Sequence, residues 1–188
     1  MSRTITVDAL KFLCQAFTEI EETAIRSLTC KRKAVGCQMY HLFEGKVITK
    51  SVVHVNGSVT GECTNEVGNC GCCHAEPRAI LEAVQKTYYK FNSLLCLYSP
   101  CTTCANLIVM SKVVRLVMYD IPTEHDMRGL HILEAGGVEV ITKHELVSLY
   151  RNYTGSHLTE ENGLTSDRLI RAQETGCLTG GTARLRQV

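Results

Sequence analysis

Two short motifs constrain this chain more than any other part of its sequence: H-A-E at residues 74–76 and P-C-T-T-C at residues 100–104. His74, Cys101 and Cys104 offer one imidazole and two thiolates, which are donor types that suit zinc. Three protein ligands leave the fourth tetrahedral position open, which is typical of a catalytic rather than a structural zinc site. Glu76 is placed to move protons beside a metal-bound water. A lone CxxC pair could be a redox pair or half of a structural site, but the two motifs in this order predict a catalytic zinc.

The hydrophobic pattern places both motifs at the start of a helix. Apolar residues recur at three- and four-residue steps over Glu76–Gln85, and Pro77 lies where a first-turn proline is tolerated. A second helix is predicted from Cys101 onward, and the short apolar run Leu94–Tyr98 between the helices is typical of a buried strand. The donors then lie near two helix N-termini, where the helix dipole favours thiolate and hydroxide.

The rest of the pattern predicts an α/β fold. The other expected helices cover residues 6–28, 126–135 and 144–150, and the other expected strands cover residues 35–40, 46–55, 113–119 and 138–141. The turn Glu44–Gly45 should join the first two strands into a hairpin. Alternation of strands and helices after residue 74 predicts parallel strands there, and the hairpin makes the sheet mixed. We therefore expect a three-layer α/β/α domain with a mixed five-stranded sheet.

Length and composition predict one soluble domain. The chain has 188 residues, of which 1–150 are predicted to form the zinc-dependent domain. Residues 151–188 are polar and rich in glycine, so we expect an extension and not a separate domain. No apolar run approaches the ~18 residues of a membrane span. The formal charge of +1 argues against a dedicated nucleic-acid binder.

The eleven cysteines are read as thiols and metal ligands. The N-terminus leads into an amphipathic pattern and not into a signal peptide. We therefore expect a cytoplasmic location and no disulfide framework. The loop Gly57–Cys73 carries four of these cysteines: Cys63, Cys70, Cys72 and Cys73. They could bind a second, structural zinc, but we favour a tight turn with small buried thiols.

The motifs resemble those of the cytidine deaminase superfamily, and within it the deoxycytidylate deaminases. H-x-E followed by P-C-x-x-C is the signature of zinc-dependent nucleobase deaminases. The similarity covers roughly residues 5–145. Three shorter segments resemble the deoxycytidylate branch: Arg26–Gly36, Asn56–Gly57 and Val117–Tyr119. Pro77–Arg78 departs from the uncharged pair that is common in relatives, which puts substrate choice in doubt more than chemistry.

The resemblance implies hydrolytic deamination of dCMP to dUMP and ammonia, which supplies dUMP for thymidylate synthesis. Zinc would be held by the three donors named above, and Glu76 would act as acid and base in turn. An amide N–H near Ala75 or Cys101 could hold the attacked base, Asn56 would bind the sugar hydroxyl, and Tyr119 would line the pocket. Asn-Gly is also a plain turn signal, and a tyrosine at a strand end is commonly a core residue.

A 5′-phosphate needs a cation or a nest of amides. Arg26 is one candidate, although a charge run is usually a solvated face. The others are Lys31, Arg32, Lys33 and Arg78. The resemblance further implies a homohexamer that responds to dCTP and dTTP, with the effector site sought in the loop Ser58–Cys72. A magnesium ion could accompany such an effector.

Other readings stay open at this point. The substrate could be dCTP, a nucleoside or a nucleic-acid base, although near-neutral charge and the lack of tryptophan weaken the polynucleotide version. A different class of function is a non-catalytic, zinc-stabilised nucleotide-binding module. The presence of Glu76 argues against that class.

Overall fold

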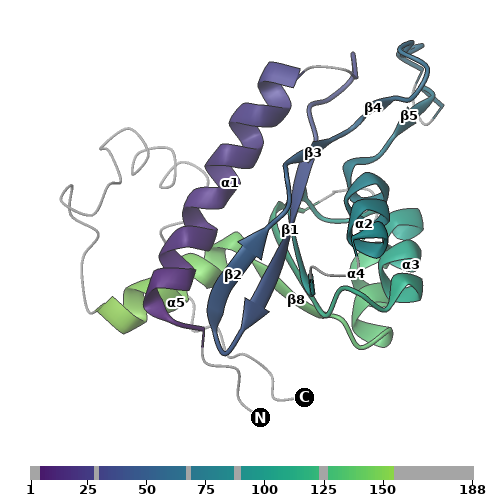
Figure 1. Ribbon diagram of the computed structural model, residues 1–188. Helices are drawn as coiled ribbons and strands as arrows, with labels where there is room; N and C mark the ends of the chain where they lie inside the picture. Colours follow the sequence, from purple (N-terminus) through teal and green to yellow (C-terminus); the bar gives the residue numbers. More distant parts are fainter. Residues whose placement is uncertain (1–4, 28–29, 67–68, 87–89, 123–126, 155–188) are drawn as a thin grey trace.

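The computed structural model describes residues 5–27, 30–66, 69–86, 90–122 and 127–154 (Figure 1). The helices are α1 (Val7–Ser27), α2 (Ala75–Gln85), α3 (Thr102–Ser111), α4 (Arg128–Ala135) and α5 (Lys143–Thr154). The strands are β1 (Gly36–Phe43), β2 (Lys46–Lys50), β3 (His54–Val55), β4 (Gly57–Ser58), β5 (Cys72–Cys73), β6 (Ser93–Tyr98), β7 (Leu116–Ile121) and β8 (Glu139–Thr142). No helix in the described ranges is both long enough and apolar enough to cross a membrane. Of the predicted extension 151–188, residues 151–154 belong to α5, and residues 155–188 lie outside the described part of the chain.

The main sheet has the strand order β2-β1-β6-β7-β8, and β3 also pairs with β1. β1 runs antiparallel to β2, β3 and β6, whereas β6, β7 and β8 run parallel. The predicted mixed sheet is confirmed, including the parallel strands that follow the first metal motif, but it has six strands and not five because the predicted strand 46–55 is divided into two. Helices connect the parallel strands because such strands need a crossover.

Helices cover both faces of this sheet (Figure 1). One hydrophobic core lies between the sheet and α2, α3 and α4, and a second lies between the sheet and α1 and α5. Side chains alternate along β6, so that Leu94 and Cys96 belong to the first core and Leu95 and Leu97 to the second. A strand buried on both faces reads as a continuous apolar run, which explains the sequence of β6.

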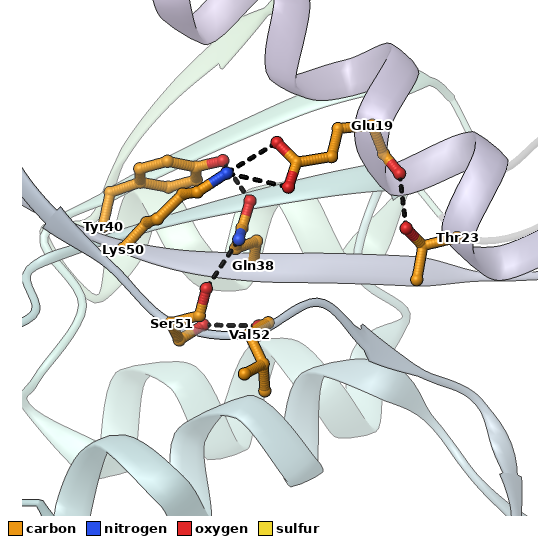
Figure 2. Close-up of polar contacts among 7 residues, drawn as sticks. All are labelled: Glu19, Thr23, Gln38, Tyr40, Lys50, Ser51 and Val52. Carbon is orange, nitrogen blue, oxygen red and sulfur yellow. Dashed lines mark hydrogen bonds and ion pairs between the residues drawn. The ribbon is translucent and has the colours of Figure 1, made fainter.

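The second hairpin strand is interrupted, and the predicted strand 46–55 is therefore the two strands β2 and β3 (Figure 2). At the break, the buried Gln38 donates from Nε2 to the Ser51 carbonyl oxygen at 2.6 Å. The Ser51 hydroxyl accepts the Met39 N–H at 3.0 Å and donates to the Val52 carbonyl oxygen at 2.7 Å. Side chains thus supply hydrogen bonds to the backbone where the strand is interrupted.

Candidate active site

The two metal motifs lie at the N-termini of two helices. His74 is the N-cap residue of α2 and Cys101 is the N-cap residue of α3, and both have extended backbone angles. Cys104 follows in the first turn of α3 and is buried, whereas Cys101 is half-buried and His74 is exposed. The three donors are therefore closed off on the Cys104 side and open on the His74 side.

The donor atoms converge on one point. The Cys104 sulfur lies 3.4 Å from Nδ1 of His74, and the Cys101 sulfur lies 3.6 Å from the same nitrogen. Two ligands at ordinary zinc–nitrogen and zinc–sulfur bond lengths on a tetrahedral ion are about 3.6 Å apart. The spacing and the chemistry of this donor set therefore fit zinc, with Nδ1 as the ligating nitrogen of His74.

Glu76 lies beside these donors in the first turn of α2. It is 4% exposed, and its Oε2 has no hydrogen-bond partner among the described residues. Burial raises the pKa of its carboxyl group above the ordinary range. A buried carboxylate oxygen without a partner is costly in a protein interior. An atom held in this way is suited to a water or substrate group that binds next to the metal.

The cluster also has the electrostatics of a cation site. The pKa of the Cys101 thiol is lowered to about 4, first by the Cys104 thiol and then by the His74 ring. Cys101 is consequently a thiolate at neutral pH, and thiolate is the form that binds metal. The N-terminus of α3 adds its positive dipole end at the same residue.

A family model matches the part of the chain that carries this cluster. The model described as "Cytidine and deoxycytidylate deaminase zinc-binding region" matches residues 11–120, which include both metal motifs and Glu76. The chain belongs to this deaminase family. The resemblance inferred from the sequence is confirmed.

Individual proteins similar to this chain are deoxycytidylate deaminases. A curated deoxycytidylate deaminase from Schizosaccharomyces pombe is 26% identical over 140 residues, which make up 66% of this chain and 42% of the yeast protein. The match thus spans less than half the length of that relative. Two crystal structures of the dCMP deaminase from cyanophage S-TIM5 are 26% identical. The match to the apo form covers 69% of this chain and 96% of the phage chain, with a TM-score of 0.52. The match to the complex with dCMP and dUMP covers 68% of this chain and 93% of the phage chain, with a TM-score of 0.54.

A small second sheet brings Asn56, which was predicted to bind the sugar hydroxyl, next to the first metal motif. β4 pairs antiparallel with β5, with Gly57 opposite Cys73. Asn56 comes just before this pair and His74 just after it, so the two lie next to each other. Ala75, the first residue of α2, is fully buried.

Asn56 has a structural role that the sequence did not indicate. Its Oδ1 accepts the Val35 N–H at 2.8 Å, and its Nδ2 donates to the Lys33 carbonyl oxygen at 2.8 Å. The side chain fastens the segment before β1 to the segment before β4. Its contact with a sugar hydroxyl stays a prediction.

Tyr119 and Arg26 lie in different layers. Tyr119 is 7% exposed, belongs to the core that contains α2 and α3, and has a pKa raised by burial. Arg26 is in the last turn of α1, on the opposite face of the sheet, and its Nε donates to the Glu22 carbonyl oxygen at 3.2 Å. Tyr119 thus lies on the face of the sheet that carries the metal motifs, and Arg26 does not share that layer. Both roles stay predictions.

The other cations predicted to bind phosphate have separate placements. Nη1 of Arg78 donates to the Val55 carbonyl oxygen at 2.8 Å, and Nζ of Lys33 lies 3.4 Å from the centre of the Tyr98 ring. Lys31 and Arg32 are exposed. Tyr98 ends β6 three residues before Cys101, so Lys33 lies against the strand that leads to the second metal motif.

Sequence reasoning missed a polar link between α2 and β3. Nε2 of His54 lies 2.5 Å from Oε2 of Glu82, and Lys86 contacts the other oxygen of Glu82. Together with Arg78, these contacts tie the helix that starts at His74 to the strand that precedes Asn56. The spacing of Arg78, Glu82 and Lys86 at four-residue steps could have indicated one polar face of the helix.

Gly129 of α4 was also missed, and it yields a prediction. A Cβ at this position would lie 2.1 Å from the Pro100 carbonyl oxygen, so only glycine allows α4 to pack on the second metal motif. We expect Gly129→Ala to displace the Cys101 segment and to lower kcat/KM by about 10- to 100-fold, the cost of misplacing a catalytic group by about 1 Å. Steady-state deamination kinetics will measure this, with Glu134→Ala on the exposed side of α4 as the control. Unchanged kinetics in Gly129→Ala would contradict the packing argument.

Proposed function

We propose that this chain catalyses the zinc-dependent hydrolytic deamination of dCMP to dUMP and ammonia, and so supplies dUMP for thymidylate synthesis. The observation that carries the proposal is the convergence of His74 Nδ1 with two cysteine sulfurs beside the unpartnered Oε2 of Glu76. Three donors with an open side suit a catalytic ion, and a carboxyl group at that side suits proton transfer.

His74, Cys101 and Cys104 would hold the ion. Zinc bound there would supply a Lewis acid and lower the pKa of a bound water. Cys104 is buried and His74 is exposed, so a substrate would approach from the side of His74. The first turn of α2, with Ala75 fully buried, forms the wall against which the base would lie.

Glu76 moves the protons of the reaction. Its Oε2 accepts the two protons of the attacking water in turn, delivering the first to ring nitrogen N3 and the second to the departing amino group. The bond between the water oxygen and C4 forms, the C4–N bond breaks, and ammonia leaves. Burial raises the pKa of this carboxyl, which brings the group closer to the pH at which it must both accept and donate.

The choice of dCMP is supported by the relatives. The phage enzyme, 26% identical, was crystallised with dCMP and dUMP, and the yeast relative is a deoxycytidylate deaminase. In this chain, Asn56 would bind the sugar hydroxyl and Tyr119 would line the pocket. Arg26, Lys33 and Arg78 are candidates for the 5′-phosphate.

We also propose that the chain assembles and is regulated in the way that the resemblance to deoxycytidylate deaminases implies. We infer a homo-oligomer with dCTP and dTTP as effectors, and we place the effector site near Ser58–Cys72, with magnesium accompanying the bound nucleotide. Three large apolar side chains on α2 and α3 support an interface: Leu81, Val84 and Met110 are 60%, 49% and 77% exposed. Exposed apolar residues grouped on neighbouring elements are typical of a protein interface.

A substrate panel tests the proposed activity. Steady-state kinetics with dCMP, dCTP, CMP and deoxycytidine, read out as ammonia and as uracil product, should give dCMP the highest kcat/KM. We expect deoxycytidine to be poorer by about 10²-fold or more, because it leaves the phosphate-binding groups without a partner. A preference for another member of the panel would reassign the substrate, and release of ammonia from none of them would favour a binding module.

A further inference from the structure

Four cysteines outside the active site lie together at the edge of the described structure. The sulfurs of Cys30, Cys63, Cys70 and Cys72 are all within 4.8 Å of one another, and those of Cys30 and Cys63 are 3.9 Å apart. Cys30 follows α1, whereas the other three belong to the segment between β4 and the end of β5. Segments more than thirty residues apart in the chain thus bring four thiols to one place.

The separation of the sulfurs distinguishes a metal site from disulfides. Four sulfurs on a tetrahedral zinc ion are about 3.8 Å apart, whereas the sulfurs of a disulfide are about 2.05 Å apart. All four cysteines are free thiols, and Cys30 and Cys63 are buried at 5% and 6% exposure. The cluster therefore has the spacing, the number of donors and the burial of a closed tetrahedral site.

The local backbone is shaped around the sulfurs. The backbone amide groups of Lys31 and Asn65 donate hydrogen bonds to the Cys63 sulfur. The Cys72 amide donates to the Cys70 sulfur in the same manner. Gly71, between Cys70 and Cys72, has a φ of 72°, which lets the chain turn so that both sulfurs face the same point. Amide donors aimed at sulfur stabilise thiolate, the form that zinc binds.

We propose that Cys30, Cys63, Cys70 and Cys72 bind a structural zinc ion. The tight turn of small thiols favoured from the sequence leaves unexplained why Cys30 joins the group. The sequence also offered Cys73 as a fourth donor, but neighbouring residues of the strand β5 point to opposite faces, so Cys72 and Cys73 cannot face the same ion. Four thiolates close the site, and no position remains for a reacting water.

The position of the cluster next to His74 indicates what a bound ion would stabilise. β5 ends at Cys73, and His74 follows immediately as the N-cap of α2. Among the described residues from Gly57 to Cys73 few apolar side chains are buried, and Val59 is 81% exposed. A zinc ion would fasten this segment to the end of α1 and so hold the first active-site motif in place. This inference is independent of the proposed reaction, because it concerns a different set of donors.

Metal analysis of purified protein tests the proposal. We expect two zinc ions per chain in the wild type, one in Cys30→Ser and one in Cys63→Ser. The matched control is Cys73→Ser, which changes the neighbouring residue of β5 and should retain two. Cys101→Ser should retain the ion of the four-cysteine cluster while losing the active-site ion, so a failure of the proposed catalytic site can be told apart from a failure here.

A measurement on the wild type covers the case in which a cluster variant does not fold. Alkylation with iodoacetamide followed by mass spectrometry should label these four cysteines slowly, and a zinc chelator should expose them together. Slow labelling that the chelator reverses supports the proposal. Any of three results would overturn the proposal. The wild type could hold one zinc ion per chain, which Cys101→Ser removes; the four thiols could be labelled rapidly without a chelator; or the mass could reveal two disulfides among them.

Discussion

Glu76→Gln is expected to retain the fold and the active-site zinc while kcat falls by on the order of 10³-fold. General acid–base groups contribute about 10²- to 10⁴-fold, and Glu76 is proposed to serve several proton transfers in one turnover. The amide of glutamine keeps the size of the carboxyl group but cannot accept and return a proton. Single-turnover and steady-state assays with dCMP, together with metal analysis, will separate lost chemistry from lost metal.

The same substitution should not reduce stability. Glu76 is 4% exposed, and burial raises the pKa of its carboxyl, so folding disfavours the ionised form of this group. An acid whose pKa is raised by folding destabilises the folded state once the pH rises above its pKa in the unfolded chain. A neutral amide removes this cost in the metal-free protein, and the melting temperature of Glu76→Gln should equal or exceed that of the wild type. Stability sacrificed for function at a reactive group is a common trade-off.

Glu19→Gln is the control for Glu76→Gln. Glu19 forms a surface ion pair with Lys50 at 2.6 Å, on the face of the sheet covered by α1 (Figure 2). Exposed pairs contribute about 1 kcal/mol or less, so this variant should keep its activity. Turnover by Glu76→Gln within about tenfold of the wild type would exclude the proton-transfer role.

The parts of the molecule that could be predicted are those fixed by short-range pattern. H-A-E and P-C-T-T-C predicted donors at two helix starts, because spacing and helix periodicity are local properties, and His74 and Cys101 are the N-cap residues of α2 and α3. The turn Glu44–Gly45 predicted the hairpin, and both residues have positive φ angles of 48° and 73°. Alternating strands and helices likewise predicted parallel pairing.

The parts that could not be predicted depend on long-range contacts. Cys30 joins a cluster with Cys63, 33 residues later, only because the end of α1 meets the segment before β5. Gly129 lies against Pro100 because α4 packs against α3 near the second metal motif. The residues next to Gly129 in the sequence do not indicate this contact. Asn56 was read as a turn residue or a sugar ligand, yet its side chain binds the backbone of Lys33 and Val35.

Cys101→Ser is expected to remove the active-site zinc and to lower kcat/KM by at least about 10²-fold, the loss that even the outer partners of a metal ligand can cause. Serine is a favoured N-cap residue, and Cys101 is the N-cap of α3, so the helix itself should tolerate the change. The loss can then be assigned to the missing thiolate and not to misfolding. The pKa of Cys101, lowered to about 4, makes it the donor that is most readily ionised in this cluster. Its replacement therefore removes a ready negative charge along with a ligand.

Metal content, activity and thermal unfolding should be measured on the same preparation of Cys101→Ser. Cys14→Ser is the matched control, because Cys14 is half-buried on α1 and packs in the core on the other face of the sheet. We expect the control to match the wild type in zinc and kcat/KM, and Cys101→Ser to lose one equivalent of zinc with a circular dichroism spectrum like that of the wild type. If Cys101→Ser keeps its full zinc content and its activity, the ion is held by other donors, and the assignment of His74, Cys101 and Cys104 as its ligands is wrong.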